Sequence, residues 1–497
     1  MNDTKTHPRK ISKFKIFVRV VLVVVLVIGL FNVFKPLPTN TNLTGGVFSV
    51  PDDSVTFLRD KTYLDSNGQI QSEQEIFDEV IKMIEGANHY ILVDMFLYND
   101  FLGTATTSYR SLSKELTEVL LKKKKENPDV VIQVVSDPIN TLYGEYASLQ
   151  FQTLRGAGVE VTLTDLTKLR DSNPIYSAFW LTFLQWVPEK ADQGRLANIL
   201  DANKTKVDIQ AYLNILNFKA NHRKVVLADY EREGRLGVST LITSANPHDG
   251  SSRHTNTAIK VDDWLWLDVI KSEEAVVRFS GGDFTPLPPE LSGNVVDLVG
   301  DTKVQLLTEQ AIKAKILEKI NELGVGHSLD ISMFYISDRD IVETLKQADQ
   351  RGVNIRLLFD PNKDAFGREK NGVPNRQVAY ELMSSSKGNT QVRWCNTHGE
   401  QCHTKLLLAK TPMQVSLIQG SANYTRRNLD NYNLETNVLV EGEASTSAIA
   451  ASQKFFDEQW GNEGGIEYSL PYEAFKDSNP FRKIHYRLFE FTGFSNW

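Results

Sequence analysis

Cysteine is scarce in this sequence of 497 residues, and there is no excess of positive charge. It contains two cysteines, and its 55 lysines and arginines are outnumbered by 62 aspartates and glutamates, giving a formal net charge of −7. Two cysteines exclude a small fold held together by several disulfides. The acidic balance argues against non-specific binding of nucleic acid, because such binding needs many basic side chains facing phosphates. A local basic groove is still compatible with this composition.

The chain has one long apolar run, and it lies near the N-terminus. Residues 16–34 read IFVRVVLVVVLVIGLFNVF, and about 20 such residues suffice to cross a bilayer. Basic residues crowd the segment 1–15, whereas few follow the run. The positive-inside rule therefore predicts a cytoplasmic tail, a transmembrane anchor and an extracytoplasmic remainder. A cleaved signal peptide is the alternative, although no small-residue cleavage site follows the run.

The rest of the chain contains the same pattern twice. The segment YILVDMFLYND at 90–100 resembles LDISMFYISD at 329–338, and VIQVVSDPINTLYG at 131–144 resembles NIRLLFDPNKDAFG at 354–367. In both copies, strand-like segments alternate with helix-like segments. This alternation predicts two similar α/β halves, each with a mixed, mostly parallel sheet flanked by helices.

The duplication also suggests where the parts of the chain begin and end. From Asp137 to His222 is 85 positions, but from the matching Asp360 to His403 is 43, so the first half carries an insertion of about forty residues. Aromatic residues in this insertion either pack between helices or face lipid. The predicted parts are a linker at 35–55, a first half at 56–279 with its insertion at about 168–210, a Gly- and Pro-rich linker at 280–300, and a second half at 301–497.

Two copies of a short motif provide the candidate chemistry. NHRKVVLADY contains His222, Lys224 and Asp229, and QCHTKLLLAK contains His403 and Lys405, with Lys410 at the acidic position. Each motif is followed by S-A-N. The downstream residues are Ser244 with Asn246 in the first copy, and Ser421 with Asn423 in the second. One H-x-K alone is a weak signal, but two copies at matching places in a duplicated chain indicate one shared site.

On these motifs the chain resembles the phospholipase D superfamily, which carries two H-x-K-x4-D motifs, each followed by G-S/T-x-N. The resemblance covers roughly residues 56–465, and the S-A-N wording is most similar to bacterial cardiolipin synthase-type members. It implies two halves related by a pseudo-twofold axis, with one active site between them. It also implies a phospholipid substrate, in a bacterial inner membrane, with the site facing the periplasm or the cell exterior. The oligomeric state is not indicated.

The resemblance leaves more than one activity open. The leading expectation is a phosphodiesterase or phosphatidyltransferase that cleaves or transfers the phosphatidyl groups of phospholipids. A nuclease of the same superfamily, acting on single-stranded nucleic acid, is the alternative. A third possibility is a non-catalytic lipid-binding or structural protein, because Lys410 breaks the second motif.

Elementary chemistry supports a two-histidine site for a phosphodiester. A neutral imidazole can attack phosphorus to give a phosphohistidine, and a protonated imidazole can supply the leaving oxygen with a proton. Lys224 and Lys405 would hold the non-bridging oxygens, and Asn246 and Asn423 would donate hydrogen bonds to them. Neither a metal nor another cofactor is required, because these cations neutralise the charge.

The two copies differ behind the histidines. Glu435 follows the second S-A-N where the first copy has Asn256, and in the family a carboxylate near that position often bonds the histidine. We expect Glu435 to pair with His403, which would raise the pKa of His403 and make it the general acid, with His222 as nucleophile. Asp229 is expected to brace backbone, with Ser244 and Ser421 in support. Lys410 is expected to be a solvated strand end.

The cysteines allow three interpretations. Cys395 and Cys402 lie seven positions apart, just before His403. In an oxidising compartment they can form a disulfide that braces the approach to His403. A metal site that includes His398 and His403 is an alternative, but the spacing matches no familiar zinc framework. Two free thiols are the third possibility.

Overall fold

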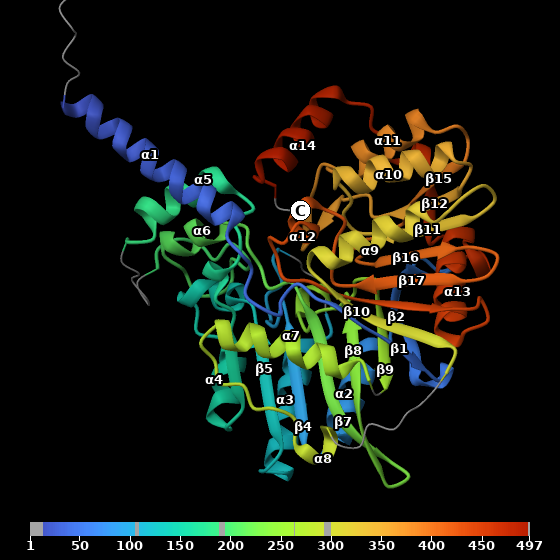
Figure 1. Cartoon of the computed structure of the whole chain (residues 1–497), viewed down its shortest axis with the longest axis horizontal. Helices are drawn as coiled ribbons and strands as arrows, with labels where there is room; N and C mark the ends of the chain where they lie inside the picture. Colours follow the sequence, from blue (N-terminus) through green and yellow to red (C-terminus); the bar gives the residue numbers. More distant parts are fainter. Residues whose placement is uncertain (1–12, 105–108, 188–193, 263, 293–299, 496–497) are drawn as a thin grey trace, which may run out of the picture.

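A computed structural model describes residues 13–104, 109–187, 194–262, 264–292 and 300–495. It contains two halves, each built on one large mixed sheet (Figure 1). The two similar α/β halves expected from the sequence are therefore confirmed. Both sheets have helices on their outer faces, and their inner faces pack against each other.

The first half has an eight-stranded sheet in the order β3-β2-β9-β8-β7-β4-β5-β6. Its strands are β2 (Val55–Leu64), β3 (Ile70–Gln74), β4 (Tyr90–Met95), β5 (Val131–Ser136), β6 (Glu160–Leu163), β7 (Lys224–Arg232), β8 (Arg235–Thr243) and β9 (Asn256–Asp262). Its helices are α2 (Ile76–Gly86), α3 (Leu112–Glu126), α4 (Leu149–Gly156), α5 (Pro174–Phe179), α6 (Ile209–Ile215), α7 (Trp266–Phe279) and α8 (Pro289–Ser292). Shorter turns are η1 (Asp52–Ser54), η2 (Pro138–Gly144), η3 (Leu166–Lys168), the π-helical η4 (Trp180–Leu184) and η5 (Asp249–Ser251).

The second half has a nine-stranded sheet in the order β1-β10-β18-β17-β16-β11-β12-β15-β19. Its strands are β1 (Thr44–Val50), β10 (Thr302–Thr308), β11 (Ser328–Met333), β12 (Asn354–Phe359), β15 (Thr390–Cys395), β16 (Lys405–Lys410), β17 (Val415–Gly420), β18 (Thr436–Gly442) and β19 (Ser469–Pro471), beside a small hairpin of β13 (Asp364–Ala365) and β14 (Arg368–Glu369). Its helices are α9 (Gln310–Asn321), α10 (Arg339–Gln350), α11 (Asn375–Ser385), α12 (Arg426–Leu429), α13 (Ser447–Gly461) and α14 (Pro480–Thr492), with short turns η6 (Glu463–Gly465) and η7 (Tyr472–Ala474).

Strand β1 corrects one sequence expectation. It lies within residues 35–55, which were expected to be a linker, yet it pairs antiparallel with β10 at the edge of the second sheet. The first folded segment after the apolar helix is thus part of the second half. Short runs such as TGGVFSV are easily missed, because two glycines weaken their strand pattern.

The expectation of mostly parallel pairing is also wrong. Parallel pairs among the described strands are confined to β4-β5-β6 and β11-β12-β15, and the other pairs in both sheets are antiparallel. The reason is that each H-x-K strand forms a hairpin with the S-A-N strand. In the first half only Glu233 and Gly234 join β7 to β8, both with positive φ, as a tight hairpin turn requires.

The two halves share one hydrophobic core between their sheets. Val225 and Leu227 of β7 face this core together with Leu406 and Leu408 of β16, whereas Val226 faces the helices of its own half. This alternation has the period of two that a strand imposes. Each such buried side chain contributes roughly 1.5–3 kcal/mol relative to an exposed one. The packing therefore fixes where the two H-x-K strands begin relative to each other.

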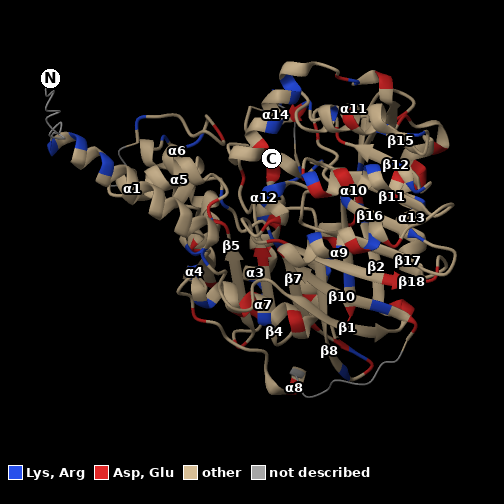
Figure 2. Cartoon of the chain, turned by 45° about the horizontal axis from the view of Figure 1, so that its top comes forward, with Lys and Arg blue, Asp and Glu red and all other residues tan. Residues whose placement is uncertain are grey.

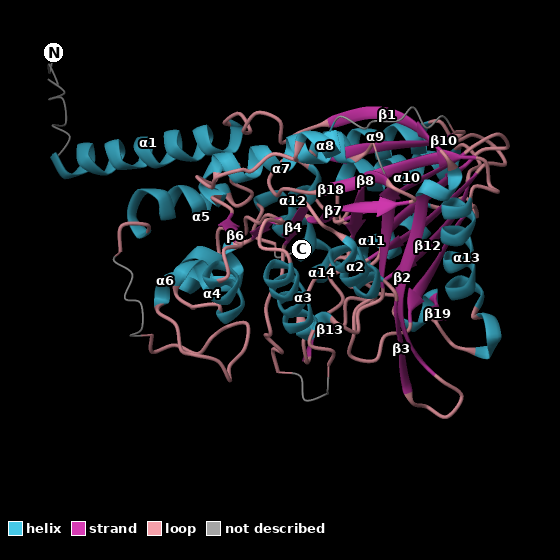
Figure 3. Cartoon of the chain, turned by 90° about the horizontal axis from the view of Figure 1, so that it is seen from below, coloured by secondary structure: helices cyan, strands magenta, loops and turns pink. Residues whose placement is uncertain are grey.

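Helix α1 (Lys13–Phe34) is long and apolar enough to cross a membrane, and it is the one such helix among the described residues. Its basic residues gather at its N-terminal end (Figure 2). Figures 1 and 3 show α1 beside α5 of the insertion. Gly29 is buried there, and a Cβ on it would lie 3.1 Å from the Cβ of Ala178. By length and composition the helix is compatible with a membrane anchor.

Candidate active site

Both H-x-K motifs meet at one cleft of about 570 Å³ between the halves. Its lining includes His222, His403, Asn246 and Asn423, so these four predicted residues are brought together. Each histidine is also held by the opposite half. The backbone N–H of His222 donates to Leu434 O (2.9 Å), and that of His403 donates to Thr255 O (2.8 Å). The interface between the two halves, which we call the seam, therefore positions both imidazoles.

The side-chain partners of the histidines cross the same seam. His222 Nδ1 lies 2.8 Å from Glu435 Oε1, and His403 Nδ1 lies 3.1 Å from Asn256 Oδ1. The expectation that Glu435 pairs with His403 is therefore wrong. The residues at the starts of β9 and β18 reach the histidine of the other half, because the segment before β18 pairs with the first motif at Asn221 and the segment before β9 pairs with the second motif at Cys402.

The motif serines act behind these partners. Ser421 donates its hydroxyl hydrogen bond to one carboxylate oxygen of Glu435, and the Asn428 amide donates to the other. In the first half, Ser244 Oγ donates to Asn256 Oδ1 at 3.0 Å. The serines thus orient the groups that in turn orient the histidines.

The two motif lysines lie beneath the histidines and are fully buried. Lys224 Nζ donates to His222 O (2.7 Å), and Lys405 Nζ donates to His403 O (3.0 Å). Burial lowers the pKa of Lys224 to about 7, although Glu435 opposes the shift. Burial, together with the neighbouring Lys224, also lowers the pKa of Lys405 well below its usual range. An anion bound above them would favour the charged forms of both ammonium groups.

The pKa values of both histidines are lowered as well. Burial lowers the pKa of His222 to about 4, with the Glu435 carboxylate acting in the opposite direction. Burial and then the Lys405 charge hold the pKa of His403 well below its usual range. Both rings are therefore neutral at pH 7 until an anion lies beside them. An anionic ligand such as a phosphodiester would supply such a charge and so favour protonation of one ring.

Two aspartates that the sequence analysis gave no role brace the start of each motif. Asp137 Oδ2 accepts a hydrogen bond from the backbone N–H of Asn221 (2.7 Å), and Asp360 Oδ2 accepts one from that of Cys402 (2.8 Å). Each holds the residue immediately before a catalytic-motif histidine. The signal was present in the repeated Asp-Pro pair, which occupies the same place in both halves.

A third histidine in the cleft was also missed. His254 lines the cleft, and its ring centroid lies 5.9 Å from that of His403. Its Nδ1 accepts from the Gln401 backbone N–H, and burial lowers its pKa to about 3. The neutral His254 ring forms part of the cleft lining. No motif in the sequence identifies His254 as a site residue.

The acidic position of the motif differs between the halves. Asp229 accepts hydrogen bonds from the backbone N–H groups of Asn88, His89 and Tyr90, as expected of a backbone brace. Lys410 is instead partly buried and forms an ion pair with Asp330. The expectation of a solvated strand end is therefore wrong. Both residues are remote from the cleft lining and act on the fold.

We expect Asp229→Ala to lower the free energy of unfolding by about 3 kcal/mol, because it leaves several backbone donors unpaired. Lys410→Ala should cost about 1 kcal/mol, because Asp330 keeps its bonds to Arg356. Urea denaturation of both variants measures the difference. A loss of turnover above about 100-fold in Asp229→Ala without a loss of stability would contradict a bracing role.

Cys395 and Cys402 are joined by a disulfide, so neither is a free thiol in the structure. Within the described ranges no group of three or more His, Cys, Asp or Glu residues could hold a metal ion. The bridge closes the loop that leads into His403, as the disulfide interpretation expected. It also lies behind the cleft, where Cys402 is held by Asp360.

Reduction should therefore destabilise the second half. A loop of this length implies a loss of roughly 2–3 kcal/mol when the bridge opens. Thermal unfolding with and without a reductant measures the shift, and a Cys395→Ser/Cys402→Ser variant should show the lower stability with no further response to reductant. Equal midpoints for the oxidised protein and this variant would show that the bridge is dispensable.

Comparison with known proteins adds to this geometry. Residues 316–460 match the family model described as cardiolipin synthase, PLD-like domain. No curated protein matches the chain. Phosphatidylserine synthase from Haemophilus influenzae Rd KW20 is similar in fold, with a TM-score of 0.56 and 12% identity over 94% of this chain and 97% of that chain.

Two other solved structures give weaker likenesses. A phospholipase D family member, Nuc, from Salmonella typhimurium has a TM-score of 0.28 and 17% identity, covering 34% of this chain and 98% of its own. Polyphosphate kinase from Porphyromonas gingivalis has a TM-score of 0.43 and 12% identity, covering 88% of this chain and 53% of its own. The matched domain at 316–460 contains the second H-x-K and S-A-N motifs, and the first half repeats both motifs, so the second half is similar to the phospholipase D-like domain family and the first half carries the same motifs.

Proposed function

We propose that this protein is a membrane-anchored enzyme that cleaves or transfers phosphatidyl groups of phospholipids through a phosphohistidine intermediate. The observation that carries the proposal is the pairing of His222 and His403 in one cleft, each held at Nδ1 by a residue of the other half. This arrangement leaves both Nε2 atoms available for a phosphorus between them. Buried lysines under both rings supply the positive charge that an anionic diester requires.

The crossed partners support a division of roles. When Nε2 of a neutral imidazole bonds to phosphorus, its ring gains positive charge, which the Glu435 carboxylate stabilises at His222. The ring that gives up its proton loses positive charge, so a neutral partner suits it, and His403 has Asn256. We therefore assign His222 as nucleophile and His403 as general acid. These are the roles expected from the sequence, but the reason differs, because Glu435 pairs with the nucleophile and not with the acid.

In the first step the His222 Nε2–P bond forms, the P–O bond to the leaving group breaks, and the leaving oxygen takes the proton of His403. In the second step His403 takes a proton from water or an alcohol, whose oxygen attacks phosphorus and releases His222. Water gives hydrolysis, and an alcohol gives transfer of the phosphatidyl group. Neither step calls on a metal, because Lys224, Lys405 and the Asn246 and Asn423 amides provide the charge and the hydrogen bonds.

Helix α1 and the disulfide support the location. An apolar helix with basic residues at its N-terminal end favours a cytoplasmic tail, with the halves outside the cytoplasm. The Cys395–Cys402 bridge fits an oxidising compartment. Labelling of an introduced cysteine before α1 and one in the 411–414 turn, in intact cells, tests this orientation. Labelling of the first and protection of the second would reverse it.

The substrate class is tested with the full-length protein in detergent. Labelled phosphatidylglycerol and single-stranded DNA are incubated with the wild type and with His222→Ala, with and without added alcohol. We expect lipid products from the wild type alone, and the effect of alcohol separates hydrolysis from transfer. Release of nucleotides without turnover of lipid would favour the nuclease alternative. Lipid binding with no turnover in either assay would favour a non-catalytic protein.

A further inference from the structure

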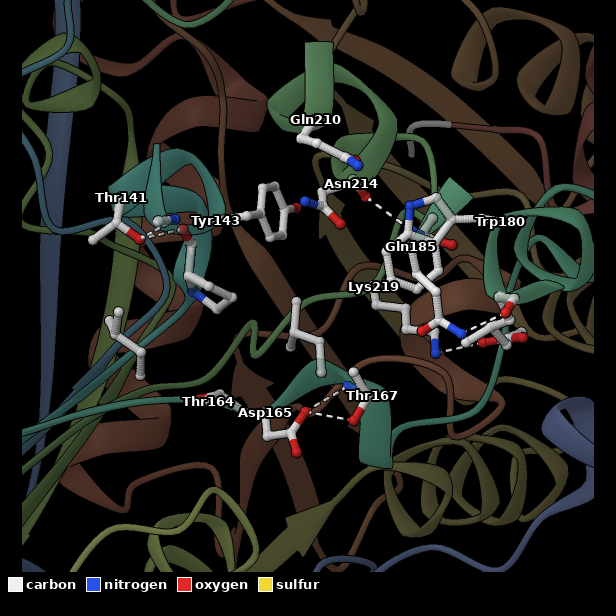
Figure 4. A pocket seen from close by; sticks show the side chains of 17 residues that line it. Thr141, Tyr143, Thr164, Asp165, Thr167, Trp180, Gln185, Gln210, Asn214 and Lys219 are labelled. Carbon is white, nitrogen blue, oxygen red and sulfur yellow. Dashed lines mark hydrogen bonds and ion pairs between the residues drawn. The ribbon is translucent and has the colours of Figure 1, made fainter. Parts of the chain in front are cut away.

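A second pocket, of about 480 Å³, opens beside the catalytic cleft. We call it the side pocket (Figure 4). It shares Tyr143 and Lys219 with the lining of the cleft, so the two cavities meet at these side chains. Lys219 is buried and ion-paired with Asp171, and it donates to Leu169 O (3.0 Å). The side pocket thus adjoins the catalytic cleft, and the charge of Lys219, the one lysine in its lining, is neutralised by Asp171.

Apart from Asp165 and the Lys219–Asp171 ion pair, the walls of the side pocket combine apolar and uncharged polar groups. Trp180, Leu181 and Gln185 come from η4 and its end, and Gln210 and Asn214 come from α6 on another side (Figure 4). The remaining walls include the segment 163–167, whose leucines and threonines surround Asp165, and the Asp165 carboxylate accepts hydrogen bonds from Thr167. Amide and hydroxyl groups bind ester carbonyls and glycerol oxygens, and the leucine and tryptophan faces accept methylene groups. This lining suits an uncharged, partly apolar part of a ligand.

The wall made by α5 and η4 also contacts the apolar helix α1. Ala178 packs on Gly29, whereas Trp180 and Leu181 line the side pocket. Four further apolar side chains of this segment are exposed at helical spacing: Ile175, Phe179, Phe183 and Trp186. One short segment therefore has one side on α1, one side on the pocket and one apolar side uncovered. Figures 1 and 3 show it running beside the helix.

The loop that separates the two cavities is strained. Leu142 and Tyr143 both have left-handed backbone angles, with φ of 46° and 60°. For residues other than glycine such angles cost roughly 1–2 kcal/mol each. The matching loop of the second half has Phe366 at φ 49°, and Phe366 lines the catalytic cleft. Both loops thus hold an aromatic ring at the cleft, and only Tyr143 has the side pocket behind it.

We propose that the side pocket binds the glycerol-ester part and first acyl carbons of a phospholipid whose phosphate lies between His222 and His403. The lipid reaches it laterally from the bilayer, along α5 and η4, whose exposed apolar side continues the membrane surface of α1. This inference rests on the proposed function, because it requires a phospholipid substrate and a membrane-spanning α1. It assigns the insertion of the first half, which the second half lacks, to substrate selection.

The test fills the side pocket from two different walls and compares two substrates. Leu181→Trp and Asn214→Phe are made in the full-length protein in detergent. Turnover of phosphatidylglycerol is divided by turnover of bis(p-nitrophenyl) phosphate, which is small enough to need the catalytic cleft alone. We expect each variant to lower this ratio at least tenfold. Leu149→Trp, an exposed leucine of α4 outside both cavities, is the matched control and should leave the ratio unchanged.

Three other outcomes would each overturn the side-pocket proposal. An unchanged ratio in both filled variants overturns the side-pocket proposal while the lipid function stands. A loss confined to transfer onto added alcohol, with hydrolysis of the lipid unaffected, would make the pocket the acceptor site and also overturn it. A wild type that turns over the small diester but no phospholipid refutes the proposed substrate class, and the pocket proposal falls with it.

Discussion

Replacing either histidine of the pair with alanine should lower kcat for a phospholipid by at least about 10³-fold, because in the proposed mechanism His222 supplies the bond to phosphorus and His403 supplies the proton. A matched His485→Ala variant, in α14 and outside the cleft lining, should keep wild-type turnover. All three should unfold at similar temperatures. A residual rate of a tenth or more in either cleft variant would contradict a two-histidine mechanism.

The leaving group separates the two roles. A p-nitrophenolate leaves without a proton, so His403→Ala should still form the phosphoenzyme from bis(p-nitrophenyl) phosphate and release one equivalent in a burst. It should then stall, because the second step needs His403 to take a proton from water. His222→Ala should show no burst. Mass spectrometry of the stalled protein should place the phosphoryl group on His222, and an adduct on His403 would reverse the assignment.

Much of this site could be predicted because its residues are local and repeated. His222 and Lys224 stand two apart, as do His403 and Lys405, and each pair leads by a hairpin to its own S-A-N. A contact within one hairpin leaves a pattern in one stretch of sequence. The duplication then indicated two halves with one shared site, which the structure places at the seam between the sheets.

What the sequence could not supply are the contacts across that seam. Glu435 lies closer in the chain to His403 than to His222, yet it pairs with His222, because the register between halves depends on the packing of two sheets. Residues that face each other across such an interface share no spacing rule. The same limit hid the side pocket, whose lining combines the insertion with the loop that holds Tyr143.

Changing the charge of the residue that contacts Nδ1 should have different effects on the pH profile at the two histidines. Glu435→Gln removes the carboxylate that stabilises the charged phosphohistidine ring at His222, so kcat should fall by about 10²–10³-fold. The loss of the carboxylate also lowers the pKa of His222 further. A nucleophile must be unprotonated, so the pKa of His222 sets the acidic limb of the kcat/KM profile. The alkaline limb, which depends on the general acid His403, should therefore not move.

Asn256→Asp makes the opposite change at the other ring. A carboxylate about 3 Å from His403 Nδ1 favours the imidazolium, so the pKa of His403 should rise. His403 must carry its proton to act as general acid, and the alkaline limb of kcat/KM should therefore move to higher pH by the same amount. If His222 were the acid instead, Glu435→Gln would shift that limb to lower pH and Asn256→Asp would leave it in place. The two profiles, measured side by side, thus assign the proton independently of any trapped intermediate.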